Sequence, residues 1–424
     1  MTDILFRLAR LIDPASDVDI IADLLVRDGK ILDLGTNLGV PDGAELIQAR
    51  DLVLVPGLVD MRVGIGEPGF EYRETIKSAG KAAVASGITS LAVLPDSSPV
   101  VDDPAIARLL RARGDEIGMV SIHPYGALTK GCAGVEMAEL GLLREAGAVA
   151  FTDGRKTLAD ARLMRRILTY ARHFGGRVVQ HPEDPSLAAG GSATEGELAT
   201  RLGLPGIPAA AEAIMVARDL RLAELSGGAI HFAHVSTAEA IGLIRRAKEA
   251  GIDVTCDTAP PYFDLNEQAI GDFRTYAKLS PPLRPEADRM AVVAGLADGT
   301  IDAIASDHQP RDADDKRYPF AQASAGGAGL ATLLGVTLAQ VHNGSLAMKA
   351  AIGLLTHKPA ALLGLPAGTL AVGAAADLCL FHPQAIWKVE AGKLPGKAQN
   401  TPFDGRALEG RVIGTWKAGR RVFG

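Results

Sequence analysis

Short apolar segments alternate with longer amphipathic segments from residue 58 to residue 310. The apolar segments lack strict alternation of polar and apolar residues, which is typical of strands buried on both faces. The segments between them predict helices, and 237–251 has Thr237 at its start and Gly251 after its last turn, both good helix boundaries. The apolar segments are 57–64, 88–96, 118–126, 148–153, 177–184, 229–237, 253–260 and 302–308. Strand–helix units repeated in this way predict a (β/α)8 TIM barrel.

The two ends of the chain have a different pattern. Residues 1–55 contain two short strand-like pieces around Asp28-Gly29, a dipeptide typical of a β-hairpin. Residues 366–424 contain further short strand-like pieces. We therefore expect an α/β protein in which a small β-sandwich domain, built from both chain ends, flanks a barrel domain at 56–365.

Composition and charge exclude several classes of function. The net charge is −6 and no basic run occurs, so we expect neither a nucleic-acid partner nor binding to a membrane. Asp3, Arg7 and Arg10 interrupt the apolar N-terminal segment, which predicts neither a signal peptide nor a spanning helix. The three cysteines lie far apart without CxxC spacing, which argues against disulfides and zinc knuckles and favours a cytoplasmic location.

Four metal-competent side chains stand at the ends of predicted strands. Asp153, His181, His234 and Asp307 end the fourth, fifth, sixth and eighth apolar segments, and they are called the strand-end residues below. Active sites of such barrels lie at the carboxyl ends of the strands, so these side chains should converge on one mouth. A lone histidine after an apolar segment is more often a core residue. Four matching positions instead favour a present or former zinc centre, with Asp307 as a proton acceptor.

Several short motifs, in a fixed order over nearly the whole chain, resemble a known family. They are PGLVDMRVGIGEPGFEYRETI, AFTDG, HPEDPSLA, HVST, SPPLR, ASDHQP and NTPFDG. Together they resemble the dihydroorotases of the amidohydrolase superfamily. The resemblance implies a metal-dependent barrel with a small β domain. It also implies an activity in pyrimidine biosynthesis, the closure of carbamoyl-aspartate to dihydroorotate.

The chain departs from the family pattern at metal ligands and at substrate contacts. The first strand of the family ends in His-x-His, two metal ligands, and these positions are Arg62 and Gly64 here. The strand-end residues match their family counterparts. Four substrate contacts of the family are replaced, so no substrate-binding residue is expected at them. They are Gly66 in place of arginine, Asp96 and Ser280 in place of asparagine, and Arg311 in place of histidine.

Arg62 is the replacement with the strongest electrostatic consequence. The phase of its strand points it into the barrel mouth, where it brings a permanent positive charge close to the place of a dication. Repulsion between such charges is several kcal/mol at about 4–6 Å in a partly buried site. The guanidinium fork also matches carboxylates. We therefore expect Arg62 to pair with Asp307, with Asp153 or with both.

Two functions follow from these residues. The first is a noncatalytic dihydroorotase-like protein with no cofactor and with Asp307 as a vestigial base. The resemblance to noncatalytic members then implies the catalytic subunit of aspartate transcarbamoylase as a partner, in a homo- or hetero-oligomer. The second is a one-metal amidohydrolase in which Asp153, His181 and His234 hold a single Zn²⁺ and Asp307 is the base. Its substrate would be dihydroorotate or a related cyclic amide.

Overall fold

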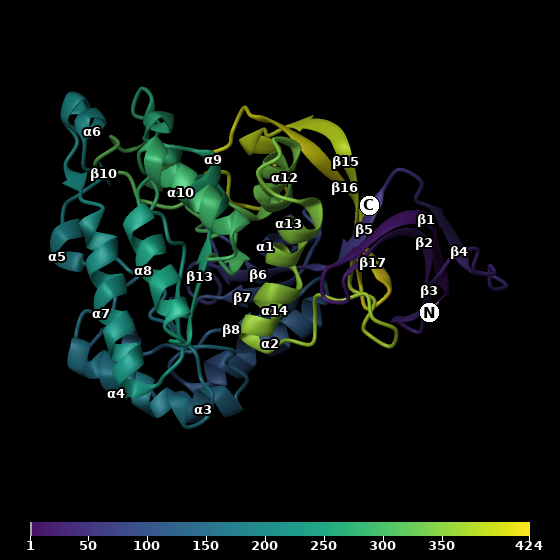
Figure 1. Ribbon diagram of the computed structural model, residues 1–424, viewed down its shortest axis with the longest axis horizontal. Helices are drawn as coiled ribbons and strands as arrows, with labels where there is room; N and C mark the ends of the chain where they lie inside the picture. Colours follow the sequence, from purple (N-terminus) through teal and green to yellow (C-terminus); the bar gives the residue numbers. More distant parts are fainter. Residues whose placement is uncertain (1) are drawn as a thin grey trace.

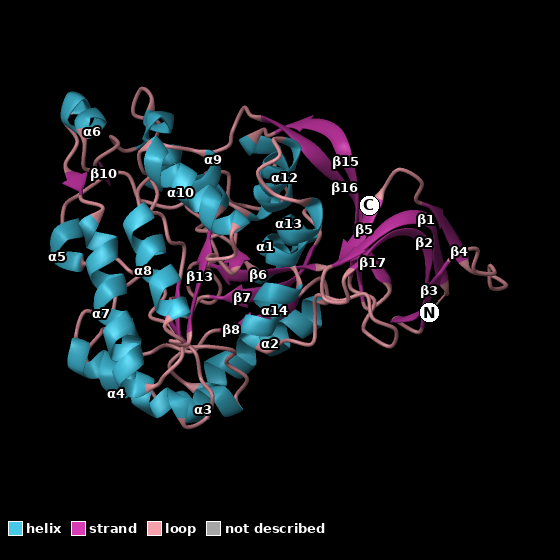
Figure 2. Cartoon of the chain, in the orientation of Figure 1, coloured by secondary structure: helices cyan, strands magenta, loops and turns pink. Residues whose placement is uncertain are grey.

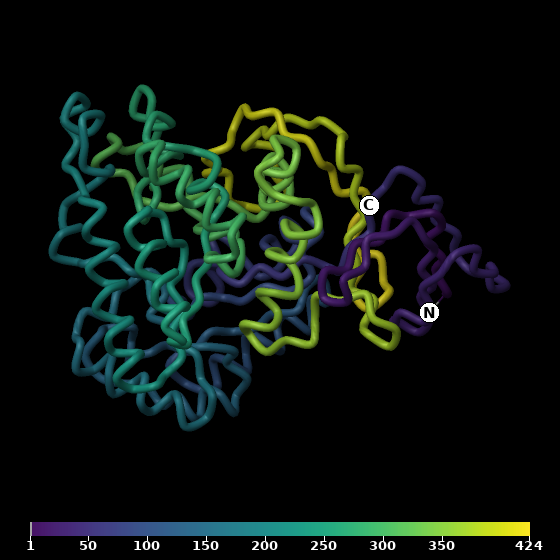
Figure 3. Tube along the Cα trace, in the orientation of Figure 1, coloured from purple at the N-terminus to yellow at the C-terminus, as the bar shows by residue number. Residues whose placement is uncertain are grey.

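The computed structural model describes residues 2–424 and contains a barrel and a separate sheet. Figure 1 shows the N-terminal strands, in purple, beside the C-terminal strands, in yellow, on one side of the molecule. The trace in Figure 3 places both chain ends on this side. On the other side the helices gather around the shorter strands of the barrel (Figure 2). The predicted fold class, a barrel with a β domain drawn from both chain ends, is confirmed.

Parallel strands close the barrel. Two runs of paired strands form most of the wall: β6 (Leu58–Val63), β7 (Ile88–Val93) and β8 (Ser121–Pro124), then β9 (Val178–Gln180), β12 (Ile230–Phe232), β13 (Val254–Thr258) and β14 (Ala303–Ile304). Phe151 joins the two runs through parallel bridges to Gly126 and Val178, and Val63 pairs with His308 to complete the ring. Each apolar segment predicted above contributes to the wall, in the predicted order.

Helices cover the outside of this wall. The larger ones are α1 (Ile76–Val84), α2 (Pro104–Ile117), α4 (Ala161–Arg172), α7 (Ala210–Ser226), α8 (Ala238–Glu249), α10 (Glu286–Ala297), α12 (Leu333–His342), α13 (Met348–Leu355) and α14 (His357–Leu363). Helix α8 begins where the sequence predicts, because the Thr237 hydroxyl accepts a hydrogen bond from the Ala240 amide. Helix α4 buries Leu163, Ile167 and Ala171 along one face, which is the helical spacing of apolar residues.

The second sheet joins the two chain ends. Its strands run in the order β17-β16-β15-β5-β1-β2-β3, with β4 beside β1. They are β1 (Ile4–Asp13), β2 (Val18–Arg27), β3 (Lys30–Gly35), β4 (Glu45–Gln48), β5 (Val53–Pro56), β15 (Leu378–Lys388), β16 (Ala407–Lys417) and β17 (Arg420–Phe423). Strand β5 is the link, because it pairs with β1 on one side and with β15 on the other. Asp28 and Gly29 both have positive φ, as the predicted hairpin requires.

No helix within residues 2–424 has the length and apolarity needed to span a bilayer.

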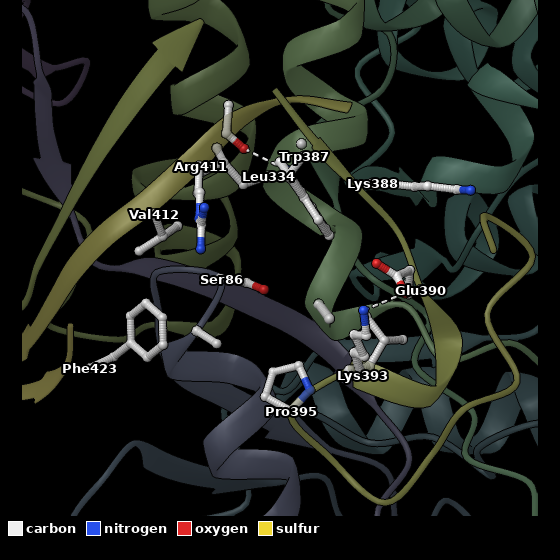
Figure 4. Close-up of a pocket in the computed structure, with 15 residues that line it drawn as sticks. Ser86, Leu334, Trp387, Lys388, Glu390, Lys393, Pro395, Arg411, Val412 and Phe423 are labelled. Carbon is white, nitrogen blue, oxygen red and sulfur yellow. Dashed lines mark hydrogen bonds and ion pairs between the residues drawn. The ribbon is translucent and has the colours of Figure 1, made fainter. Parts of the chain in front are cut away.

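A cavity of about 460 Å³ lies where the sheet meets the barrel. Figure 4 shows Trp387 from β15 and Leu334 from α12 at its wall. The Trp387 indole donates a hydrogen bond to the Gly410 carbonyl at 2.9 Å, which fixes the ring there. No strand-end residue lines this cavity. It is therefore separate from the barrel mouth described next.

Candidate functional site

The strand-end residues converge on the barrel mouth, as their positions predict. His181, His234 and Asp307 follow β9, β12 and β14, and Asp153 follows the bridge residue Phe151. Their exposed fractions range from 1% to 9%. Arg62, on β6, shares the mouth with them and is 2% exposed. The barrel topology thus brings together five side chains that lie far apart in the sequence.

Arg62 forms a buried ion pair with Asp307. Its Nε donates to Asp307 Oδ1 at 3.0 Å, and its Nη2 donates to the Gly154 carbonyl oxygen at 3.0 Å. Within residues 2–424 Arg62 makes no hydrogen bond to Asp153. The expected pairing is therefore found with Asp307 and not with Asp153.

Asp153 is held by Thr129 instead. The Thr129 amide donates to Asp153 Oδ1 at 2.9 Å, and its hydroxyl donates to Oδ2 at 2.5 Å. Burial raises the pKa of Asp153 above its ordinary value, and these two donors act in the opposite direction. Both carboxylate oxygens are thus already engaged.

His181 and His234 bind each other. His181 Nδ1 lies 2.6 Å from His234 Nε2, so one nitrogen donates the shared proton and the other accepts it. His234 Nδ1 lies 3.6 Å from Asp307 Oδ1 and has no hydrogen-bond partner in the described part of the chain. Burial, with the nearby charge of Arg62, lowers the pKa of His234 well below its ordinary value. His234 is therefore neutral at physiological pH.

Two of these residues have a left-handed backbone. His234 has φ of 42° and Asp307 has φ of 46°, a conformation that costs roughly 1–3 kcal/mol for a residue other than glycine. Neighbouring polar groups hold both. Asp257 accepts from the His234 amide at 2.6 Å, and Gln309 Nε2 donates to both Asp307 oxygens at 3.0 Å. With this left-handed backbone, the side chains of His234 and Asp307 point into the mouth.

In the described part of the chain, the mouth has no preformed shell for the metal centre that the fold family implies. Three ligands and a water complete a catalytic zinc shell. Within residues 2–424, no group of three or more His, Cys, Asp or Glu side chains is arranged to hold a metal ion. Such a shell would require the His181 and His234 rings to separate, because their nitrogens now share a proton, whereas each Asp153 oxygen keeps a free lone pair beside its hydrogen bond from Thr129. The remnant metal site predicted at Asp153, His181 and His234 stays a prediction.

Gly66 leaves no room for the substrate-binding arginine of the family. A Cβ atom at this position would lie 2.0 Å from the Phe70 carbonyl oxygen and 2.8 Å from the Glu74 carbonyl oxygen. Gly64 is less crowded, since a Cβ there would lie 3.0 Å from the His308 carbonyl oxygen. Both positions pack backbone against backbone, so a larger side chain requires the loop to move.

The other three replaced positions have new partners. Asp96 accepts from Arg155 Nε at 2.7 Å, and Arg311 Nε donates to the Ala325 carbonyl oxygen at 2.8 Å. The Ser280 hydroxyl lies 3.4 Å from the His181 ring. Asp96 and Arg311 are thus both bound to other groups of the chain at the mouth.

The sequence reasoning missed four residues that support the mouth: Thr129, Asp257, Gln309 and Asp60. Asp257, Gln309 and Asp60 could have been found in the sequence, because each is a charged or amide residue inside or next to an apolar barrel segment. Asp257 also accepts from His231 Nε2 at 2.9 Å, so it holds both β12 and the His234 backbone that follows this strand. Thr129 lies in a loop and carried no such signal.

Asp60 makes the mouth sensitive to pH. Burial raises its pKa to about 6, and its Oδ2 has no hydrogen-bond partner within residues 2–424. The folded protein therefore binds a proton more tightly than the unfolded chain, and this contribution to stability is lost as pH rises from about 4 to about 6. A shift of about two pKa units corresponds to roughly 3 kcal/mol.

We expect Asp60→Asn to remove the loss of stability that Asp60 causes between about pH 4 and pH 6. The Asn oxygen can still accept from the Ser306 and Arg62 amides, which donate to Asp60 Oδ1 at 3.0 and 3.2 Å. The free energy of unfolding, measured in urea at a series of pH values, should favour the variant increasingly as pH rises from about 4 to about 6 and by a constant amount above that. Parallel pH profiles for the two proteins would show that Asp60 is not the responsible group.

Comparison with solved structures places the fold among hydantoinases and dihydropyrimidinases. The L-hydantoinase (dihydropyrimidinase) of Arthrobacter aurescens superposes with a TM-score of 0.88 at 25% identity, over 99% of this chain and 96% of that one. The dihydropyrimidinase of Brevibacillus agri superposes with a TM-score of 0.84 at 23% identity, over 99% and 95%. The second match supports the fold alone.

Proteins found by sequence comparison are more similar to this chain than these solved structures are. The family model described as dihydro-orotase-like matches residues 51–240. A protein of Pelobacter propionicus named dihydroorotase is 46% identical over 421 residues, covering 99% of both chains. One of Citrifermentans bemidjiense with the same name is 44% identical over 421 residues, with the same coverage. This similarity over the full length, together with the barrel and its strand-end residues, shows that the chain belongs to the dihydroorotase family.

Proposed function

We propose that this chain is a noncatalytic member of the dihydroorotase family that supports the assembly or activity of aspartate transcarbamoylase. The observation that carries the first part is the buried Arg62–Asp307 pair, with an Nε–Oδ1 distance of 3.0 Å. In the family, His-x-His stands at the position of Arg62. The fixed positive charge of Arg62 repels a dication at the same place. It also pairs with Asp307, the residue that would act as proton acceptor in the family.

The substrate side supports the same proposal. Dihydroorotate carries a carboxylate, for which arginine is the bidentate partner. Gly66 offers no charge, and it leaves no space for a charged side chain because an added Cβ would lie 2.0 Å from the Phe70 carbonyl oxygen. Asp96 brings a negative charge that would repel the substrate. Changes at both sets of positions are expected where neither hydrolysis nor substrate binding constrains the chain.

The partner rests on the resemblance to noncatalytic family members that act as subunits of aspartate transcarbamoylase. With this partner we place the chain in pyrimidine biosynthesis and in the cytoplasm, and we propose a homo- or hetero-oligomer. Three cysteines that are all buried and free agree with a reducing compartment.

The test uses the purified chain in two assays. In the first, zinc content and dihydroorotate hydrolysis are measured beside the Pelobacter propionicus relative as a positive control. We expect zinc far below one atom per chain and no turnover. In the second, the chain is mixed at micromolar concentration with the aspartate transcarbamoylase catalytic subunit of the same organism. We expect co-elution and a gain in transcarbamoylase activity or stability, whereas separate elution would contradict the partner role.

A second candidate function is an active one-metal amidohydrolase. The observation that favours it is the 46% identity to a protein named dihydroorotase over the full length. Asp153, His181 and His234 would be its metal ligands and Asp307 its base. One tightly bound zinc together with turnover in the first assay would establish this function and overturn the noncatalytic one.

A further inference from the structure

A cavity of about 440 Å³ opens at the barrel mouth, above the strand-end residues. Asp153 and Ser280 form part of its lining, which places it on the side where the barrel strands end. Four cationic side chains also line it and are called the mouth cations below: Arg73, Arg155, Lys156 and Arg311. The volume is large enough for a small metabolite.

Little negative charge from the protein balances the mouth cations. Two carboxylates line the cavity, and Asp153 already accepts both hydrogen bonds from Thr129. Asp96 pairs with Arg155 through Nε only. Four positive charges therefore face two lining carboxylates, of which one accepts from Thr129, and the carboxylate of Asp315 lies outside the lining beside Arg73.

The remaining cations have weak or neutral partners. Lys156 Nζ donates to the Cys132 carbonyl at 3.1 Å, and Arg311 uses its Nε for the Ala325 carbonyl. Arg73 Nε lies 3.8 Å from the Asp315 carboxylate and has no hydrogen-bond partner within residues 2–424. Guanidinium nitrogens of three arginines are thus free to bind a ligand in the cavity.

The arginines also repel one another. Burial, together with the nearby charges of Arg155 and Arg73, lowers the pKa of Arg311 to about 10. Since Arg73 and Arg155 keep 22% and 33% of their side-chain surface exposed, a ligand can reach them from solvent. An anion between these groups would relieve the repulsion in a partly desolvated place, where charge pairing is screened little.

We propose that the mouth cavity binds a small phosphorylated metabolite, with the phosphate monoester held between the mouth cations. The mouth cations come from the loops after three different strands of the wall, so they surround the cavity. A tetrahedral phosphate offers acceptors in several directions and suits several guanidinium groups at once, whereas a planar carboxylate suits one fork. The inference goes beyond the proposed function, because it concerns binding alone and holds with or without hydrolysis.

The test is isothermal titration of the full-length protein with glycerol 2-phosphate at constant ionic strength. Glycerol is the neutral control, and succinate is the dicarboxylate control. We expect saturable binding of the phosphate ester, weakened about 10- to 100-fold by Arg155→Gln or Arg311→Gln. Arg221→Gln, at an exposed arginine outside the cavity, should leave the affinity unchanged.

A further variant tests the charge balance without removing a cation. Asp96→Asn deletes a negative charge from the lining and frees Arg155, so the phosphate ester should bind several-fold more tightly. If Arg311→Gln fails to fold, the separate variants Asp96→Asn and Arg155→Gln still test the proposal. No binding of glycerol 2-phosphate at millimolar concentration, or binding of succinate alone, would overturn the proposal. Neither outcome depends on zinc content or on the partner assay.

Discussion

Replacement of Arg62 with alanine is expected to lower the free energy of unfolding by about 3–5 kcal/mol. The reason is the burial of its partner. Asp307 is 9% exposed, and without the guanidinium its charge would face only Gln309 and the neutral His234. The Gly154 carbonyl would also lose its donor. Urea unfolding at pH 7.5 measures the change.

A second substitution, at Asp307, separates the effect of the unpaired charge from the effect of the packing that Arg62→Ala removes. Arg62→Ala with Asp307→Asn removes both charges, and asparagine tolerates the left-handed backbone that position 307 requires. The double variant should recover much of the lost stability. Arg221→Ala, which breaks the exposed pair with Glu224, is the matched control and should leave stability nearly unchanged. A loss below about 1 kcal/mol for Arg62→Ala would mean that the pair is not a major support of the mouth.

Restoring the two family histidines is expected not to restore dihydroorotase activity. In Arg62→His, Gly64→His the new side chain at 64 meets a backbone oxygen at 3.0 Å from its Cβ. The substrate contacts stay replaced, and Asp96 stays paired with Arg155 at 2.7 Å. Each missing charged contact costs about 1.5–3 kcal/mol, so turnover should be at least about 1,000-fold below an active relative.

Two further measurements make that result interpretable. Zinc content of the double variant is determined separately, so that a failure of metal binding is not mistaken for a failure of substrate binding. Gly66→Arg is added in a third variant, which should unfold readily because its Cβ would lie 2.0 Å from the Phe70 carbonyl oxygen. Dihydroorotate hydrolysis by the double variant at a rate less than about 1,000-fold below that of an active relative would refute the prediction.

The sequence predicted the barrel well because its signals are local. Each wall strand is an apolar segment of a few residues, and helix α8 carries its own start signal in Thr237. The convergence of the strand-end residues then follows from the barrel topology rather than from any property of their neighbours. The strand phase also placed Arg62 inside the mouth, where the structure has it.

The partners within the mouth could not be predicted in the same way. Arg62 pairs with Asp307 and not with Asp153 because Thr129, from a separate loop, already holds Asp153. The hydrogen bond between His181 and His234 depends on a rotation of two rings that no pattern records. The crowding at Gly66 likewise arises from the path of the Phe70 loop, so only the folded structure shows that an arginine has no space at this position.

Arg62 also changes what the chain needs from its surroundings. A metal centre forms only when the cell supplies the ion and when its ligands are deprotonated, so folding and metal supply are linked. Arginine is part of the chain and stays charged at every physiological pH. With Arg62 against Asp307, the mouth of this barrel obtains its buried positive charge during synthesis. With the noncatalytic function proposed above, its stability should therefore be the same in metal-starved and metal-replete cells and unaffected by chelators.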